Sequence, residues 1–225
     1  MARRTLPSAP KPRADGLLQV DLHSRTALVV GPPEMIAESV AGAMTANGAS
    51  VSIEPVEAAS ARGSDQFAAV DFLVIVHELR PDVPPAGAAL AHIAATAGIA
   101  MAARGSGRLV HILSALGLIP MRRHREHSIA MASAVAEMRT LAMTLGAEVR
   151  VNAICLGAIA APPERGGDFI AGSEAMLSHV PLARPGTLQD VANAVLFLCD
   201  PLNSYMTGQV LTVDGGWAAG YARNF

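Results

Sequence analysis

The stretch Thr26-Ala27-Leu28-Val29-Val30-Gly31 decides the fold class of this chain of 225 residues. A run of apolar and β-branched residues without alternation is typical of a strand that is buried on both faces, and Gly31 marks a turn. Apolar residues at helical spacing follow over residues 34–47. The pattern therefore predicts a buried strand, a tight turn and a helix, the repeating unit of folds in which helices cover a parallel sheet.

The same alternation continues along the chain. Further strands are expected near residues 50–54, 71–77, 108–114, 149–155 and 209–213, and further helices near 86–104, 127–147 and 187–199, with a short one near 172–179. Strands that alternate with helices predict an α/β fold with one parallel sheet wound on both faces. We expect a single domain over residues 22–225, without an internal repeat.

Composition agrees with one globular domain, because a chain of this length can bury a sizeable core. Hydrophobic residues make up 51% of the chain and aromatic residues only 4%, so the core is built mainly from aliphatic side chains. A net charge of −2 argues against nucleic acid or an anionic membrane as the main partner. Cys155 and Cys199 lie in apolar segments, which favours reduced buried thiols and a cytoplasmic protein.

Residues 1–21 differ from the rest of the chain. Basic side chains and prolines dominate this segment, and no apolar run follows the charges. The segment is therefore not a secretory signal, and we expect a disordered basic tail. A transit peptide and an anion-binding arm are the alternatives.

Several stretches in the same order resemble the short-chain dehydrogenase/reductase family, and particularly its 3-oxoacyl-(acyl-carrier-protein) reductases. They are Thr26–Gly31, Asp71–Val76, Gly107–Ser114, Arg150–Ile159, Arg184-Pro185-Gly186 and, as the most specific match, Thr207-Gly208-Gln209-Val210-Leu211-Thr212-Val213-Asp214-Gly215-Gly216. The resemblance covers roughly residues 22–220. It implies a Rossmann-like doubly wound sheet, a nicotinamide cofactor, and a catalytic Ser, Tyr and Lys.

The cofactor loop departs from the family pattern TGxxxGxG. The aligned run is Val30-Gly31-Pro32-Pro33-Glu34-Met35-Ile36-Ala37, which keeps only the first glycine. The prolines remove N–H donors that could face an anion, and Glu34 adds a carboxylate where a phosphate would lie. We expect no bound cofactor on this chain, its loop residues being degenerate: Gly31, Pro32, Pro33, Glu34, Met35 and Ala37.

The segment between residues 55 and 70 is too short for the helix, strand and second helix that the family places there. We therefore expect a sheet shortened on this side, with the third strand and a flanking helix reduced or missing. In the family this region forms much of the wall around adenine. Glu54 could mimic the acidic residue that holds the adenosine ribose, but an exposed strand end is the preferred interpretation.

The catalytic positions are also replaced. Ser114 matches the family's Ser, but His127 occupies the Tyr position and Met131 the Lys position. A new pair of Ser114 and His127 is conceivable, because His titrates near neutral pH, yet no carboxylate is placed to orient the imidazole. His127 belongs to the polar run Arg122–His127, which indicates a solvated loop before a helix, or a basic loop for an anionic substrate. We expect no catalytic residue and no metal site.

The segments expected at subunit interfaces are retained. Helices 86–104 and 127–147 are apolar or small around most of their circumference, and such helices are buried on more than one side. The resemblance implies that they form a four-helix bundle with a neighbouring subunit, and that the C-terminal segment forms a second interface. Ala dominates helix 86–104 and His92 interrupts it, so we do not expect it to span a membrane.

Three hypotheses follow. The first is a non-catalytic subunit that pairs with an active short-chain dehydrogenase, which would carry NAD or NADP on the partner subunit. The second is a stand-alone ligand-binding or regulatory homo-oligomer that uses the old substrate cleft of the family, between Ser114 and residues 162–182. The third is an enzyme with altered chemistry at Ser114 and His127.

Overall fold

The computed structural model describes residues 16–32, 35–171 and 174–220, and its main sheet has six parallel strands in the order β2-β1-β3-β4-β5-β8. The strands are β1 (Thr26–Val30), β2 (Ser50–Glu54), β3 (Phe72–Val76), β4 (Gly107–Ser114), β5 (Val149–Leu156) and β8 (Val210–Val213). The long helices are α1 (Met35–Ala46), α3 (Gly87–Arg104), α4 (Arg125–Thr144) and α6 (Leu188–Cys199). The predicted α/β fold is confirmed.

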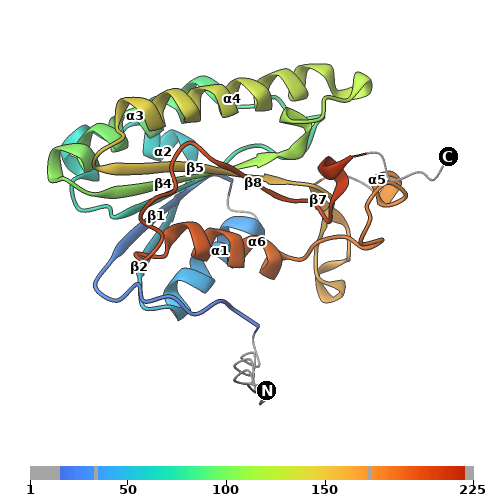
Figure 1. Ribbon diagram of the computed structural model, residues 1–225, viewed down its shortest axis with the longest axis horizontal. Helices are drawn as coiled ribbons and strands as arrows, with labels where there is room; N and C mark the ends of the chain where they lie inside the picture. Colours follow the sequence, from blue (N-terminus) through green and yellow to red (C-terminus); the bar gives the residue numbers. More distant parts are fainter. Residues whose placement is uncertain (1–15, 33–34, 172–173, 221–225) are drawn as a thin grey trace, which may run out of the picture.

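Helices cover both faces of this sheet (Figure 1). α3 and α4 lie side by side on one face, and α1 and α6 lie on the other. Side chains along each buried strand alternate between the two layers. In β3, Leu73 and Ile75 belong to the core under α3 and α4, whereas Val74 and Val76 belong to the core under α1 and α6.

The side of the sheet next to β2 is shortened, as the sequence predicts. Residues 55–70 form the short helix α2 (Val56–Ser60) and the 3₁₀ turn η1 (Ser64–Phe67), and no strand. β2 pairs only with β1 and is therefore the edge of the sheet. Phe67 is fully buried, so this short connection closes the core beneath α3 in place of a longer strand and helix.

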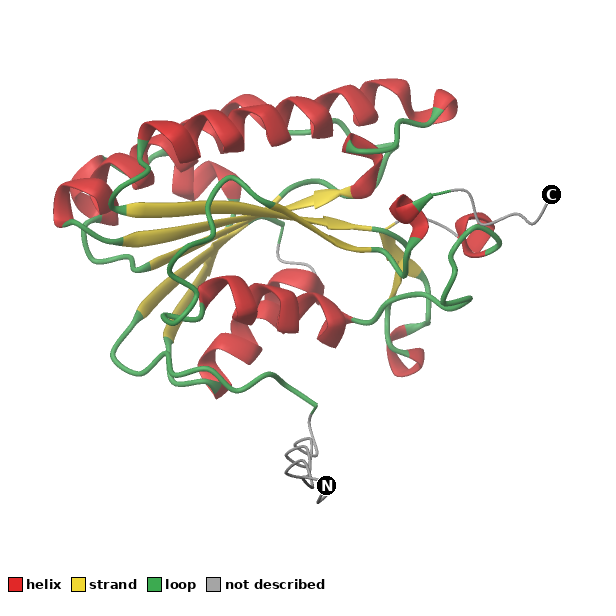
Figure 2. Ribbon diagram, viewed as in Figure 1, coloured by secondary structure: helices red, strands yellow, loops and turns green. Residues whose placement is uncertain are grey.

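A second, two-stranded sheet follows β5. β6 (Ile159–Ala160) pairs antiparallel with β7 (Phe169–Ala171), and the short helix α5 (Glu174–Leu177) comes next. Figure 2 shows this small sheet outside the main one. The sequence predicts the short helix but not the hairpin, because strands of this length carry too few residues for a period to be visible.

The described part of the N-terminal segment, from residue 16 onward, already makes contact with the domain. The backbone N–H of Leu18 donates to Asn193 Oδ1 at 2.7 Å, and that of Val20 donates to Asn47 Oδ1 at 2.9 Å. Residues 16–20 are therefore held against α6 and the end of α1. Residues 1–15 of the predicted tail lie outside the described residues.

Within the described residues, α3 is the one helix long and apolar enough to cross a membrane by length and composition. Its mean hydropathy is 1.2, and 39% of the segment is buried in the fold. Core helices pass the same test, since a helix packed on a sheet is also apolar. The length of α3 therefore carries no argument about membranes.

Candidate functional site

Ser114 ends β4, the position that the family resemblance assigns to a catalytic serine. Its side chain is buried, and its Oγ accepts a hydrogen bond from the backbone N–H of Leu116 at 3.3 Å. This bond caps the 3₁₀ turn η2 (Ala115–Gly117). The hydroxyl therefore has a local structural partner, which is the usual role of Ser at the start of a helical turn.

His127 lies in the first turns of α4, and the structure corrects our interpretation of it. We expected the run Arg122–His127 to be a solvated loop, and most of it is exposed, in the 3₁₀ turn η3 (Arg122–His124) and the start of α4. His127 itself is only 2% exposed. Neither ring nitrogen has a hydrogen-bond partner among the described residues, so Ser114 and His127 do not form a pair.

Glu78, which follows β3, is a carboxylate that the sequence analysis missed. Burial lowers the pKa of His127, and the negative charge of Glu78 partly opposes this effect. Arg80 binds Glu78 through two hydrogen bonds, Nε to Oε1 at 3.0 Å and Nη2 to Oε2 at 3.2 Å. Burial acts to raise the pKa of Glu78, but the bonds from Arg80 outweigh it and the pKa is lowered. Glu78 is thus neutralised by Arg80 rather than bonded to His127.

Met131 is part of the apolar core. It is 1% exposed and belongs to the cluster beneath α3 and α4. Gly117 packs directly on it, since a Cβ at Gly117 would lie 2.8 Å from the Met131 carbonyl carbon. A lysine here would bring an ammonium group into a closed apolar contact, where an unpaired charge is strongly unfavourable.

The cofactor loop is shaped by contact between strands. Gly31 has a φ of +153°, and a Cβ at this position would lie 2.7 Å from the Val76 carbonyl oxygen. The close approach of β1 to β3 therefore explains Gly31 without a nucleotide. Met35 begins α1 and Ala37 is fully buried against the sheet. Pro33 and Glu34 lie outside the described residues.

Glu54, the candidate ribose ligand, already has a partner. Arg62 Nε donates to Glu54 Oε2 at 2.9 Å, Arg62 Nη2 donates to Oε1, and the guanidinium lies over the ring of Phe67. The side chain of Glu54 is 23% exposed, so the expectation of an exposed strand end is wrong. A ribose would have to displace an ion pair that holds the 55–70 connection. Of the two candidate positions, Glu54 does not fit a ribose ligand while it is paired with Arg62, and Gly31 is accounted for by its contact with Val76.

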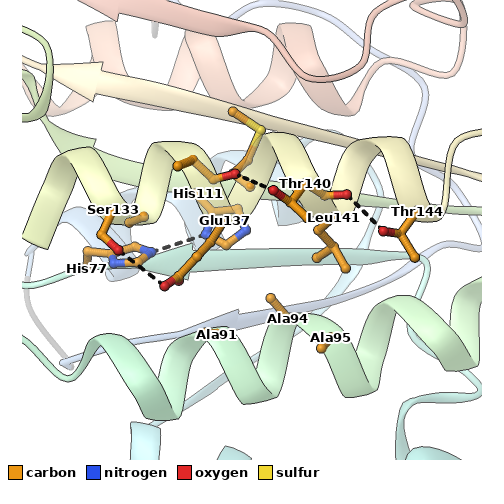
Figure 3. A pocket seen from close by; sticks show the side chains of 13 residues that line it. His77, Ala91, Ala94, Ala95, His111, Ser133, Glu137, Thr140, Leu141 and Thr144 are labelled. Atoms are coloured by element: carbon orange, nitrogen blue, oxygen red, sulfur yellow. Dashed lines mark hydrogen bonds between the residues drawn. The ribbon is translucent and has the colours of Figure 1, made fainter.

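A histidine pair lies between the sheet and the layer of α3 and α4. His77 Nε2 is 3.1 Å from His111 Nδ1, and both side chains are buried. They line a cavity of about 370 Å³ together with the facing sides of α3 and α4 (Figure 3). Burial lowers the pKa of His111 to about 4, and burial and the neighbouring His111 lower the pKa of His77 well below its usual value.

The sequence carries a signal for this pair that we did not use. His77 shares its strand parity with Leu73 and Ile75, and His111 shares its parity with Leu109 and Leu113. Strand periodicity therefore places both imidazoles on the α3 and α4 face. Within the described ranges, no group of three or more His, Cys, Asp or Glu side chains could hold a metal ion.

The C-terminal segment is retained for local structural reasons. Asp214 accepts hydrogen bonds from the backbone N–H groups of Gly216 at 2.9 Å and Ala218 at 2.7 Å. Gly157 allows the ends of β5 and β8 to meet, because a Cβ there would lie 2.7 Å from Asp214 Cβ. These contacts fix the turn after β8 without a ligand.

Comparison with known proteins gives a family match over residues 87–218, to the model described as enoyl-(acyl carrier protein) reductase. The chain is 34% identical over 126 residues to 7α-hydroxysteroid dehydrogenase of Escherichia coli, covering 56% of this chain and 49% of that protein. It is 38% identical over 114 residues to a 3-oxoacyl-(acyl-carrier-protein) reductase of Chlamydia muridarum, covering 50% and 46%. The chain thus spans about half the length of the curated relatives it matches.

The structural match is longer than the sequence match. The structure of a 7α-hydroxysteroid dehydrogenase complexed with NADH and 7-oxo glycochenodeoxycholic acid aligns with a TM-score of 0.72 at 25% identity, covering 91% of this chain and 97% of that one. A structure described as a betaketoacyl-ACP reductase aligns with a TM-score of 0.71 at 28% identity, covering 89% and 100%. The fold is therefore shared well beyond residues 87–218.

Proposed function

This chain belongs to the short-chain dehydrogenase/reductase family, and from that premise we propose that it is a non-catalytic subunit which assembles with an active member of the same family. The active partner would hold NAD or NADP, and this chain would hold none. The observation that carries the proposal is Met131, which is packed into the apolar core at the position of the family's catalytic lysine.

The residues at the family's Tyr and Lys positions, His127 and Met131, support a loss of catalysis. A Tyr and a Lys one helical turn apart would place an acid and its charged partner on one face. At these positions the chain has a buried imidazole without hydrogen bonds and a buried thioether. Burial lowers the pKa of His127, so the ring stays neutral near pH 7 and has no bonded carboxylate to orient it.

The cofactor side supports the same conclusion. The family match begins at residue 87, the first residue of α3, and so leaves out the segment that contains the cofactor loop and the 55–70 connection. In that segment Gly31 serves a contact with Val76, and Glu54 is bound by Arg62. Hydride transfer requires a nicotinamide cofactor, and the ribose of its adenosine half would have to displace Arg62 from Glu54.

The outer faces of α3 and α4 support assembly. Ile99, Ile129 and Met143 are 60%, 53% and 78% exposed, although each is a large apolar residue on a long helix. Between Ile129 and Met143, the exposed face of α4 carries small residues such as Ala132 and Ala136. Exposed apolar groups flanking small ones suit the close approach of a second helix pair. In this proposal the partner is an active paralogue, and a second copy of this chain is the partner in the second candidate below.

A stand-alone ligand-binding homo-oligomer is the second candidate, and the cavity between α3 and α4 is the observation that favours it. Ser114 does not line this cavity, which therefore differs from the old substrate cleft that the sequence analysis assigned to this hypothesis. In that case the chain would be recovered with itself alone. The third candidate, an enzyme with altered chemistry, requires turnover that is lost in His127→Ala.

The test is recovery of a tagged chain from its native source, as wild type and as the double variant Ile99→Glu/Met143→Glu. Glutamates on the outer helix faces should release a family partner, because burying two unpaired carboxylates at an interface is strongly unfavourable. Leu182→Glu is the control, since Leu182 is exposed to a similar degree but lies outside both helices. A wild-type protein that is recovered as a monomer, or a double variant that keeps its partner, contradicts the proposal.

A further inference from the structure

The cavity between α3 and α4 contains a buried polar atom that the described protein does not satisfy. His111 is 4% exposed, and its Nε2 has no hydrogen-bond partner among the described residues. Its other ring nitrogen is engaged by His77 at 3.1 Å. A buried polar atom without a partner costs free energy unless water or a ligand meets it. The cavity is where such a partner could enter, because His111 is one of its lining residues.

The rest of the lining is mostly apolar. Ala91, Ala94 and Ala95 line the cavity from α3, and Met138 and Leu141 line it from α4. Figure 3 shows the two imidazole rings towards one end and Leu141 and Thr144 towards the other. A volume of about 370 Å³ lies within the range of small-molecule sites, which combine apolar walls with a few placed polar groups.

We propose that this cavity binds a small uncharged molecule with an apolar body and a hydroxyl head, of the alcohol or phenol class, whose hydroxyl bonds to His111 Nε2. The lining comes from one chain. It includes Ala136, on the α4 face that we propose for subunit contact, so ligand binding and assembly would use neighbouring parts of this face. The apolar body would lie along the alanines of α3 and Leu141 of α4.

The head group follows from the histidine pair. One ring must donate to the other, but either ring can be the donor, so His111 Nε2 is a donor in one tautomer and an acceptor in the other. A hydroxyl both donates and accepts and therefore suits either arrangement.

The charge of the ligand follows from the groups around it. Both histidines remain neutral near pH 7, because burial holds their pKa values low. Glu137 is the carboxylate on the wall, and its Oε1 accepts a hydrogen bond from Ser133 Oγ at 3.4 Å. The described residues that line the cavity include no Lys or Arg, so an anionic ligand would meet the Glu137 carboxylate without a compensating cation, which disfavours carboxylates and phosphates.

The experiment is isothermal titration of the purified full chain with three probes of similar shape: 4-ethylphenol, ethylbenzene and 4-ethylbenzoate. We expect 4-ethylphenol to bind with a Kd below about 1 mM, ethylbenzene about tenfold more weakly, and 4-ethylbenzoate not at all. Absence of 4-ethylphenol binding would mean that His111 Nε2 is met by water, and would overturn the proposal. Equal affinity for ethylbenzene would overturn the role of the hydroxyl.

Variants locate the site. Ala95→Leu fills the cavity from α3 and should abolish binding of 4-ethylphenol, whereas Ala103→Leu, on the exposed side of the same helix, should leave it unchanged. His111→Leu should bring the affinity for 4-ethylphenol down to that for ethylbenzene. Binding that persists in Ala95→Leu places the ligand elsewhere and overturns the assignment, even if His111→Leu does not fold.

Discussion

Gly31 at the end of β1 lies against Val76 at the end of β3, so closely that a Cβ on Gly31 would stand 2.7 Å from the Val76 carbonyl oxygen. The first glycine of the cofactor motif is thus retained by a contact between neighbouring strands. A glycine at this position would be required whether or not a nucleotide were ever bound.

Gly31→Ala should therefore destabilise the chain itself. The new methyl group collides with backbone, and the φ of +153° is unfavourable for alanine, so we expect a loss of about 2 kcal/mol or more in the free energy of unfolding. Urea denaturation measures this change. Gly42→Ala in α1 is the control, because nothing lies within 4 Å of its Cβ position, and it should stabilise the helix slightly. Equal stability of the two variants would contradict the contact.

Most of the fold was predictable from the sequence because its elements are long and buried. The strand β3 is a continuous apolar run, and β1, β4 and β5 are largely apolar. The boundaries of all four agree with the expected ranges to within one residue. The β6–β7 hairpin and α2 were missed, since each is too short to show a period. The missing strand after β2 was predicted from the length of residues 55–70 compared with the elements that the family resemblance implies there.

Introducing the family's Tyr and Lys at positions 127 and 131 should not produce enzymatic activity. His127→Tyr/Met131→Lys places an ammonium group in a closed apolar contact, so we expect the free energy of unfolding to fall by about 3 kcal/mol. The variant should show no reduction of ketone substrates with NADPH or NADH as cofactor. Arg139→Lys is the control, because it places an ammonium group at an exposed position of α4, and its free energy of unfolding should equal that of the wild type. A stable, active double variant would show that the cofactor site is intact.

The burial of His127 was also readable from the sequence. Residues 127, 131, 134, 138 and 142 recur at helical spacing, and all five are buried along α4. The charged run Arg122–Glu126 directly before His127 favours a solvated loop, although His127 is the first member of the helical series of buried residues. Glu78 was missed for a different reason: its effect on His127 depends on a tertiary approach between the end of β3 and α4, which no local pattern encodes.

The histidine pair should make stability depend on pH. The pKa of His111 is about 4 in the folded chain and about 6.5 in the unfolded chain, so the unfolded state gains its proton first as the pH falls. The contribution of His111 to the free energy of unfolding is therefore fully present above about pH 6.5. It declines below that pH, and on the order of 2 kcal/mol is lost by pH 5. Urea midpoints between pH 7.5 and 5 measure the slope.

His111→Leu should flatten that slope, because it removes the group that must be protonated. A slope unchanged in His111→Leu would contradict the low pKa assigned to His111.

Arg62→Ala tests whether the ion pair with Glu54 is what excludes the ribose. The pair is only partly buried, so we expect its loss to cost about 1 kcal/mol of stability. The freed Glu54 should still not bind NADH, because residues 55–70 form only a short helix and a 3₁₀ turn where the family resemblance implies the wall around adenine. Titration with NADH checks this. Binding in Arg62→Ala and not in the wild type would mean that Arg62 alone blocks the site.

The most direct test of the central claim is native mass spectrometry of the untagged complex purified from its native source. The account predicts a second chain of dehydrogenase size carrying NAD or NADP, together with this chain carrying none. An assembly made only of this chain, with NAD or NADP bound to it, would contradict both the loss of the cofactor site and the role as a non-catalytic partner.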